Sequence, residues 1–338
     1  MMNRWEMTAP GRRNLELVSR PIPRPGPGEI LVEVAAVALN YRDTLVIEHG
    51  LPVPMPQPFS PASDMAGTVV ATGPGADRFQ TGDRVISVFN PRWIDGRPSG
   101  SGRDLSHDVL GGALQGVLAS HVVMPQGWVV AAPSSLDDAE AATLPCAGLT
   151  AWFALVDQGA LRAGQTVVVQ GTGGVALFGI QIAAAHGAEV IVTSGDATKL
   201  NRAVALGARH GIDRRAHDWV AEVHRLTADR GADHVLEIVG GPHLGRALDA
   251  AAMGGIVSLI GVIEGFDISA SALPMFLKKL RIQGIGVGPI RALEDLVRAV
   301  DHLRLKPVID RRYALADLPA ALDHLAAGPF GKVVVTAR

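Results

Sequence analysis

A run of β-branched residues that opens into a glycine-rich turn constrains the fold of this chain more than any other segment. The run is Thr166–Gln170 (TVVVQ), the turn is Gly171–Ala176 (GTGGVA), and an apolar stretch extends from Val175 to about His186. β-Branched residues favour a strand, and the apolar stretch favours a buried helix. A second strand is expected at Glu189–Thr193, so the segment predicts a βαβ unit and an α/β fold class.

Each small residue of this turn has a physical role in such a unit. Gly171 permits the tight turn, Gly173 lets the backbone approach a pyrophosphate, and Ala176 allows the helix and strand to pack closely. The helix N-terminus offers unpaired N–H groups and the positive end of its dipole to phosphate. The turn therefore predicts a dinucleotide site, and we assign its contacts to Gly171, Thr172, Gly173, Gly174 and Val175.

The sequence pattern changes near residue 132, which predicts two domains. Short β-branched runs bounded by Pro, Gly and Asp come first, at Glu29–Val37, Gly67–Ala71, Arg84–Phe89 and Ser120–Met124. Strands and helices then alternate, with strands expected at Thr166–Gln170, Glu189–Thr193, His210–Asp213, His234–Val239, Gly255–Gly261 and Leu280–Val287. Helical runs are expected to end at Gly187, Gly207 and Gly254. Six strands in this alternation are the number of a complete doubly wound parallel sheet.

The C-terminal tail is too short to form a domain of its own. It contains two amphipathic helical patterns, Ala292–Leu305 and Leu315–Ala327, and a final strand pattern, Lys332–Thr336. We expect the tail to return to the first domain. The predicted domains are therefore 1–132 with 287–338, and 133–286.

Composition excludes several functional classes. The 338 residues are 48% hydrophobic and 19% charged, so the chain can bury a sizeable core. The net charge of −2 gives no reason to expect a nucleic-acid partner, and no apolar run is long enough to suggest a membrane partner. The N-terminus lacks the apolar core of a signal peptide, so a cytoplasmic location is expected. Cys146 is the one cysteine, which excludes an internal disulfide and a four-cysteine zinc site.

Several motifs in order resemble one family. They are Leu39–Asp43 (LNYRD), Ser63–Val69 (SDMAGTV), Gly82–Val85 (GDRV), Ala147–Trp152 (AGLTAW), the turn Gly171–Ala176 and the glycine pattern Gly254–Gly261. Together they resemble the medium-chain dehydrogenase/reductase superfamily, in its zinc-free, quinone-oxidoreductase-like or zinc-type alcohol dehydrogenase-like branch. The resemblance implies a GroES-like β-barrel catalytic domain, a Rossmann domain, a cleft between them, and hydride transfer to or from a nicotinamide.

The resemblance also bears on a catalytic metal. In zinc-dependent relatives three residues hold the ion, and here Asn40, Ser63 and Cys146 match their positions. An amide, a hydroxyl and one thiol are a poor zinc site, and 90–112 lacks the cysteines of a structural-zinc lobe. We therefore expect no metal. The resemblance places Cys146 beside the nicotinamide, where it shapes the pocket; the alternative is a small buried hydrophobe.

Candidate catalytic residues follow from the same resemblance. Asn40, Tyr41 and Arg42 match positions that face the substrate, where an amide, a phenol and a guanidinium can polarise a carbonyl. Thr150 resembles a residue that contacts the nicotinamide, and the alternative is a helix N-cap. A structural alternative also stands for the motif: Arg42 pairs with Asp43 to hold the loop, and Tyr41 only packs.

The residues after the second strand favour one nicotinamide cofactor. Ser194 stands where NAD enzymes place an acidic residue on the ribose, and Lys199 and Arg214 suit a 2′-phosphate. NADP(H) is therefore favoured over NAD(H), although Asp196 could turn to the ribose instead. Weaker resemblances assign further cofactor contacts to Gly240, Gly261, Val262, Val287 and Lys332.

These patterns predict an NAD(P)H-dependent, zinc-independent oxidoreductase that transfers hydride to a small electrophile, either a quinone or a conjugated enone or enal. Alternatives of the same superfamily are an enoyl-thioester reductase and an alcohol or aldehyde dehydrogenase. An alternative of another class is a non-catalytic, NADPH-binding structural or regulatory protein. The resemblance implies a homodimer, with edge strands at Leu280–Val287 paired across a two-fold axis. The loop Asn90–Gly112, with Trp93 and Arg97, either covers the pocket or is a surface excursion.

Overall fold

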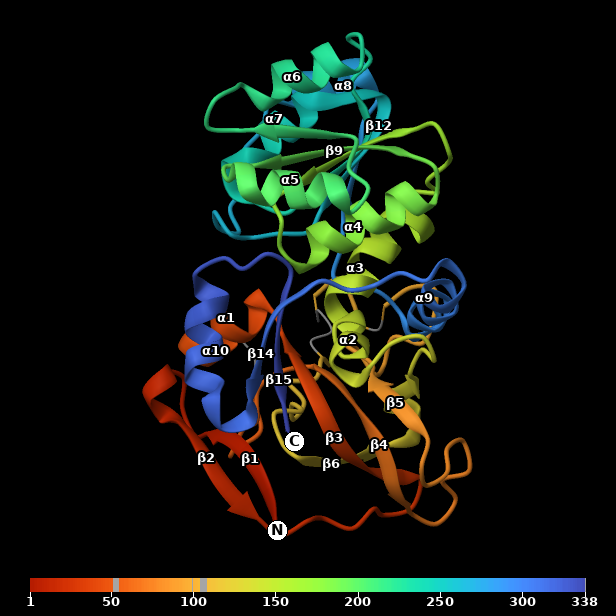
Figure 1. Cartoon of the computed structure of the whole chain (residues 1–338), viewed down its shortest axis with the longest axis vertical. Coiled ribbons are helices and arrows are strands. Elements are labelled where there is room, and N and C mark those ends of the chain that lie inside the picture. Colours follow the sequence, from red (N-terminus) through yellow and green to blue (C-terminus); the bar gives the residue numbers. More distant parts are fainter. Residues whose placement is uncertain (51–54, 99, 104–107, 338) are drawn as a thin grey trace. The chain divides into compact units, whose positions relative to one another are not determined.

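The computed structural model describes residues 1–50, 55–98, 100–103 and 108–337, in two compact units (Figure 1). The first unit comprises Met1–Leu149 and Gly288–Arg338, and the second comprises Thr150–Val287. The chain therefore leaves the first unit once and returns to it with its tail. Residues 99 and 104–107 of the loop Asn90–Gly112 lie outside the described residues.

The described residues of the first unit form a seven-stranded, largely antiparallel sheet in the order β14-β15-β3-β4-β5-β7, with β6 paired to β3. Its strands are β3 (Glu29–Leu39), β4 (Asp64–Thr72), β5 (Arg84–Ser87), β6 (His121–Pro125), β7 (Val129–Ala131), β14 (Ile309–Ala314) and β15 (Lys332–Thr336). The four strand patterns expected before residue 132 are all present, with ends shifted by a few residues. An N-terminal hairpin of β1 (Met2–Met7) and β2 (Leu15–Arg20), and strand β14, had no predicted counterpart.

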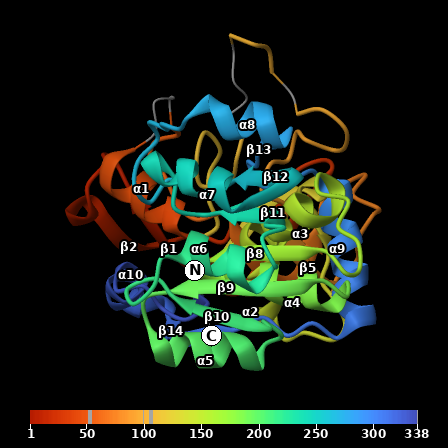
Figure 2. The same ribbon diagram turned by 90° about the horizontal axis from the view of Figure 1, so that it is seen from above.

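The second unit is built on a parallel sheet of six strands. They are β8 (Thr166–Gln170), β9 (Glu189–Ser194), β10 (His210–Asp213), β11 (Ala232–Glu237), β12 (Ala251–Leu259) and β13 (Arg281–Gly284). Their order in space is β10-β9-β8-β11-β12-β13, which Figure 2 shows from one edge to the other. This is the order of a doubly wound dinucleotide-binding fold, so the predicted α/β class is confirmed.

Helices connect these parallel strands and cover the sheet. They are α4 (Gly174–Ala185), α5 (Ala197–Ala205), α6 (Trp219–Leu226), α7 (Leu244–Ala250) and α8 (Ala272–Lys278). Gly187 and Gly207 follow α4 and α5 with positive φ, as expected of residues that end a helix. The helix end expected at Gly254 is wrong, because α7 stops at Ala250 and Gly254 lies inside β12. Its φ of 72° accompanies a shift in the β11–β12 register, which indicates a bulge.

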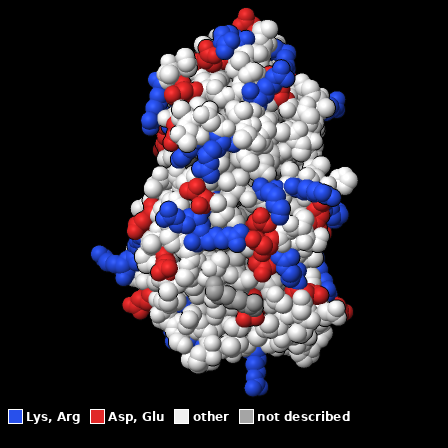
Figure 3. Space-filling view, viewed as in Figure 1, with Lys and Arg blue, Asp and Glu red and all other residues white. Residues whose placement is uncertain are grey.

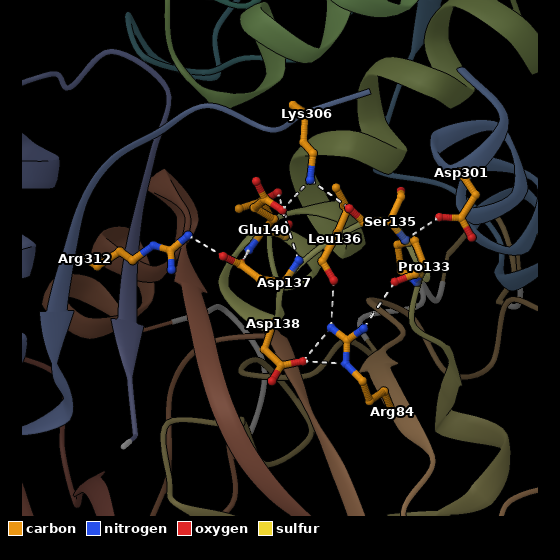
Figure 4. Close-up of polar contacts among 11 residues, drawn as sticks. Arg84, Pro133, Ser135, Leu136, Asp137, Asp138, Glu140, Asp301, Lys306 and Arg312 are labelled. Atoms are coloured by element: carbon orange, nitrogen blue, oxygen red, sulfur yellow. Dashed lines mark hydrogen bonds and ion pairs between the residues drawn. The ribbon is translucent and has the colours of Figure 1, made fainter. Parts of the chain in front are cut away.

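The segment 133–149 belongs to the first unit, so the boundary drawn at residue 132 moves to 149. Ion pairs and hydrogen bonds hold this segment around helix α2 (Asp138–Ala141), as Figure 4 shows. Arg84 on β5 donates to Asp138 at 2.7 and 2.9 Å and to the Leu136 carbonyl at 2.9 Å. Three further contacts come from the C-terminal segment: Asp301 with Ser135, Lys306 with Glu140, and Arg312 with Asp137.

The C-terminal segment adds two helices to the first unit, α9 (Ile290–Leu303) and α10 (Leu318–Ala326). Both match the predicted amphipathic patterns. On the face that Figure 3 shows, acidic and basic side chains are intermixed, in keeping with the small net charge. Within the described parts of the chain, no helix is long and apolar enough to cross a membrane.

Candidate active site and cofactor site

Three neighbouring strands of the first unit bring distant polar residues together. The motif Leu39–Asp43 spans the end of β3 and the first turn of α1 (Tyr41–His49). On one side, β15 pairs with β3 so that Val333 lies opposite Leu39, which sets Lys332 beside Asn40. On the other side, Ala38 pairs with Asp64 of β4. Asn40 therefore leaves the sheet between a lysine and a carboxylate.

Asn40 is held at three of its atoms. The Lys332 ammonium donates to the Leu39 carbonyl at 2.6 Å and to Asn40 Oδ1. The Asn40 backbone N–H donates to Asp43 Oδ2 at 2.8 Å, and the Asn40 carbonyl accepts from the Asp43 N–H at 2.9 Å. Asn40 Nδ2 is buried and has no hydrogen-bond partner among the described residues. The amide nitrogen is thus the one polar atom of this residue without a hydrogen-bond partner among the described residues.

Asp64 is the second centre of the cluster. Its two carboxylate oxygens accept from Ser63 Oγ at 2.6 Å and from the Cys146 backbone N–H at 3.1 Å. Cys146 lies in a π-helical segment, Leu144–Gly148, whose wider hydrogen-bond pattern releases backbone groups to other partners. Asn40, Ser63 and Cys146, which the resemblance matched to ligand positions, are therefore gathered around one buried carboxylate.

Burial raises the pKa values of the acidic groups in this cluster. Asp43 is fully buried, and desolvation raises its pKa to about 6, although the Arg42 guanidinium opposes the effect. Desolvation also raises the pKa of Asp64, against the Lys332 ammonium and the Ser63 hydroxyl. The pKa of the Cys146 thiol is raised by burial and by the nearby Asp64 carboxylate. A neutral thiol is a poor nucleophile, so this geometry favours a pocket-shaping role for Cys146.

The two other residues of the motif differ in their surroundings. Arg42 donates to the Leu110 and Gly111 carbonyls at 3.3 and 3.2 Å and lies 3.4 Å from Asp43. These contacts match the structural alternative, in which Arg42 holds a loop, and they leave its substrate-polarising role without support. Tyr41, on the first turn of α1, is 47% exposed and can reach solvent or a ligand.

Thr150 does not cap a helix. It is the second residue of α3 (Leu149–Trp152), which continues directly from one π-helical segment into another, Phe153–Asp157. An N-cap has non-helical backbone angles, so the capping alternative is wrong. Thr150 is buried at the first position of the second unit. Its predicted contact with the nicotinamide stays a prediction.

The donor atoms of the first unit do not suit a zinc ion. Zinc prefers thiolate, imidazole and carboxylate ligands. Among the described residues, no group of three or more His, Cys, Asp and Glu side chains could hold a metal. Asn40 Oδ1 already accepts from the Lys332 ammonium, and the Cys146 thiol has a raised pKa. A dication that bound Asn40 Oδ1 would face the adjacent positive charge of Lys332.

The glycine turn of the second unit fits a dinucleotide. Gly171 has a φ of 77°, which only glycine adopts readily, and Gly173 begins α4 without a side-chain cap. A Cβ atom added at Gly171 or Gly173 would meet no atom within 4 Å, so space for a ligand lies next to the backbone. The close helix–strand approach occurs at Gly179, where an added Cβ would lie 2.6 Å from Leu236. Ala176, to which the sequence assigned that contact, is also buried.

The residues predicted to select the cofactor gather at the ends of β9 and β10. Ser194 ends β9, and its carbonyl accepts from the Arg214 N–H at 3.0 Å. Asp196, the competing ribose ligand, caps α5 by accepting from the Lys199 N–H at 3.0 Å. Sequence reasoning missed Arg215, whose side chain lies so close to Gly195 that an added Cβ would be 2.7 Å from its Nε. Two consecutive arginines after a strand were the available signal.

Two further loops meet at the carboxyl ends of β11 and β12. An added Cβ at Gly240 would lie 2.6 Å from the Gly261 carbonyl, and one at Gly261 would collide with the Ile238 carbonyl. Gly240, Gly261 and Val262 are therefore brought together, and their predicted contacts with the cofactor stay predictions. The buried Glu237 had not been singled out. Its carboxylate accepts from the Val239 and Gly240 N–H groups at 3.1 and 2.9 Å, so it shapes this loop.

Two of the weaker predicted cofactor contacts have distinct environments. Val287, the last residue of the second unit, has a φ of 69°, which is strained for a β-branched residue. Lys332 belongs to the first unit, and its ammonium binds Leu39 and Asn40. The structure thus places Lys332 in the Asn40 cluster, whereas the sequence analysis had assigned it to the cofactor.

Comparison with known proteins finds a matching family model for each part of the chain. A family model described as an alcohol dehydrogenase GroES-like domain matches residues 26–134, and one described as a zinc-binding dehydrogenase matches 174–302. A zinc-type alcohol dehydrogenase-like protein of Schizosaccharomyces pombe is 34% identical over 317 residues, which is 91% of each chain.

Solved structures show the same relationship over nearly the whole length. One assigned as an alcohol dehydrogenase of Sinorhizobium meliloti 1021 is 58% identical, with a TM-score of 0.97 over 99% of this chain and 98% of that one. An NAD-dependent alcohol dehydrogenase is 34% identical, with a TM-score of 0.89 over 99% of this chain and 100% of that one.

Proposed function

Because this chain belongs to the medium-chain dehydrogenase/reductase superfamily and is an NAD(P)-dependent oxidoreductase, we propose that it transfers hydride without a catalytic metal, to a quinone or to a conjugated enone or enal. The observation that carries the proposal is the Asn40 cluster: an ammonium contacts Asn40, and by resemblance Asn40 and Ser63 match two metal-ligand positions of zinc-dependent relatives. Reduction of a conjugated acceptor needs hydrogen-bond donors for the oxygen that gains charge, and a Lewis acid is not required.

The chain's own residues have distinct tasks in this proposal. Bound nicotinamide supplies the hydride. The turn Gly171–Ala176 holds the pyrophosphate on the N-terminus of α4, and the glycine loops after β11 and β12 orient the rest of the cofactor. Asn40 Nδ2 donates a hydrogen bond to the oxygen of the acceptor. The Tyr41 hydroxyl supplies the proton that completes the reduction, and solvent protonates Tyr41 again. Cys146 excludes water as a half-buried, neutral thiol.

A second candidate function is alcohol or aldehyde dehydrogenation. The names of the three similar proteins given above favour this alternative over quinone or enone reduction, since each is described as an alcohol dehydrogenase or as alcohol dehydrogenase-like. An alkoxide intermediate needs strong stabilisation, which a zinc ion provides in many enzymes of this activity. In this chain the same Asn40 and Tyr41 donors would have to provide it.

One panel of reactions tests both candidates. Purified protein is given NADPH or NADH with quinones, enals, enoyl-CoA thioesters and simple aldehydes, with and without a chelator. The proposal expects chelator-insensitive reduction of a quinone or enal. Chelator-sensitive oxidation of an alcohol with NAD(P)⁺ would establish the second candidate instead and exclude metal-independent chemistry.

We also propose NADP(H) as the cofactor, on the basis of the hydroxyl of Ser194 and the cations around it. Ser194→Asp places a carboxylate where the 2′-phosphate would lie, and repulsion should lower the NADPH-over-NADH preference by about tenfold or more. Arg215→Ala should weaken NADPH binding and leave NADH binding unchanged. The ratio of kcat/KM for the two cofactors measures both effects. An unchanged ratio in both variants would favour NAD(H).

A homodimer is the proposed assembly. Strand β13 ends the sheet order, so its outer edge has no strand partner among the described residues. Large apolar side chains near it are exposed, with Phe266 at 77% and Phe276 at 70%. A second copy that pairs edge to edge would cover both the strand and these rings. Light scattering should give about twice the chain mass of 35.4 kDa, and Phe276→Asp should lower it. A monomeric wild type would contradict this assembly.

A further inference from the structure

Lys332 is an unusual residue for the interior of a sheet. It is 3% exposed, and its ammonium donates to the Leu39 carbonyl at 2.6 Å and to Asn40 Oδ1. The pairing of Val333 with Leu39 fixes its place, because the adjacent register position sets Lys332 beside the end of β3. A buried ammonium is costly unless hydrogen bonds and opposite charges compensate it.

The compensating charges are the two carboxylates of the same cluster. Asp43 and Asp64 are both completely buried, and Lys332 is the cation with the largest effect on Asp64. Arg42 serves Asp43 in the same way, at 3.4 Å. Lys332 and Asp64 therefore stabilise each other's charge, from the two strands that flank β3.

The ammonium also dictates how the Asn40 side chain is turned. An ammonium has donors only, so it must face the amide oxygen, and a rotated amide would set Nδ2 against a positive charge. The nitrogen is thereby directed away from Lys332. It lies near enough to Asp64 to lower the pKa of that carboxyl, yet makes no hydrogen bond of normal geometry with any described residue. A buried donor without a partner is costly and indicates a role in binding.

We propose that Lys332 is a positioning residue: it holds Asn40 by its amide oxygen and keeps the amide nitrogen as the donor for the substrate oxygen. This role rests on the proposed metal-independent reduction. Lys332 touches neither the cofactor nor the substrate in this scheme, and it acts through Asn40. The Lys332 ammonium thus provides a fixed positive charge that contacts Asn40 and compensates the Asp64 carboxylate.

The test is a double-mutant cycle on the full-length enzyme. Asn40→Asp keeps an oxygen for Lys332 but removes the donor, and it should lower kcat roughly 100-fold, the loss typical of one such donor. Lys332→Met should lower kcat by a similar factor, while KM for NADPH stays within about twofold. The double variant should lose no more than either single variant, because both changes remove one interaction. Lys332→Arg should restore part of kcat.

Comparison of Lys332→Met with Lys332→Met/Asp64→Asn controls for misfolding. Lys332→Met leaves Asp64 without its main compensating cation, so Lys332→Met/Asp64→Asn removes one charge of each sign and should fold. It should remain slow and retain NADPH binding. Full kcat in Lys332→Met, or additive losses in the cycle, would overturn the positioning role. Wild-type protein that reduces nothing in the panel refutes the proposed function itself, and the positioning role then falls with it.

Discussion

Replacing Gly173 with Val is expected to abolish cofactor binding while leaving the fold intact. Gly173 is the N-cap of α4 and has an ordinary negative φ, and an added Cβ would meet no atom within 4 Å. The space it would fill is the space we assign to the pyrophosphate. Loss of the close backbone approach should raise Kd for NADPH at least ~100-fold, equivalent to about 3 kcal/mol. Fluorescence titration with NADPH measures it.

The control for this prediction is Gly127→Val. Gly127 also has open space around its Cα and no positive φ, but it lies in the first unit, in the segment Gln126–Trp128. This variant should bind NADPH as the wild type does. Gly173→Val should unfold about 1 kcal/mol more easily, because Val is a poor N-cap. NADPH binding that survives in a folded Gly173→Val variant would mean that the turn does not contact the cofactor.

Asp43→Asn should change the pH dependence of stability. The pKa of Asp43 rises from 3.8 to about 6 on folding, so the folded state holds the proton more tightly. The wild type therefore has its full share of stability from this group below about pH 4, and loses it as pH rises through 6. The asparagine side chain of the variant cannot ionise. Relative to wild type, the free energy of unfolding of the variant should increase by up to about 3 kcal/mol as the pH rises from 4 to 7.

Urea unfolding at a series of pH values measures this difference. Asp64, whose pKa is also raised by burial, is present in both proteins, so its contribution largely cancels. Asp267→Asn is the matched control, because Asp267 is exposed and should leave the pH dependence unchanged. A constant difference between Asp43→Asn and wild type would show that Asp43 titrates in the folded protein as it does in the unfolded chain.

Much of the second unit could be predicted because its signals are local. The strand Thr166–Gln170 has the predicted bounds, since a run of β-branched residues between turn residues favours extended structure. Strand β10 also lies where a strand was expected, near His210–Asp213. The Gly254 error has a local cause as well. The run of small residues before it suits a helix by propensity, but pairing with β11 draws Ala251 and its neighbours into β12.

The candidate site could be predicted only in part. Asn40, Ser63 and Cys146 were found through a resemblance, whereas Lys332 was assigned to the cofactor. Its contact with Asn40 joins residues 292 positions apart, and no local pattern reports such a pairing. Glu237 left a weak signal, a carboxylate inside an apolar strand pattern, because a buried charge requires specific partners.

The sequence by itself determined the family, the α/β class and the glycine turn, because side-chain periodicity and backbone freedom at glycine act over a few neighbouring residues. Only the tertiary structure decided how the polar residues of the first unit combine. The registers of β15 and β4 on β3 set Lys332 and Asp64 on either side of Asn40. Register depends on the packing of whole strands in one core. The contact between the Asn40 amide and the Lys332 ammonium therefore could not be predicted from the motif Leu39–Asp43.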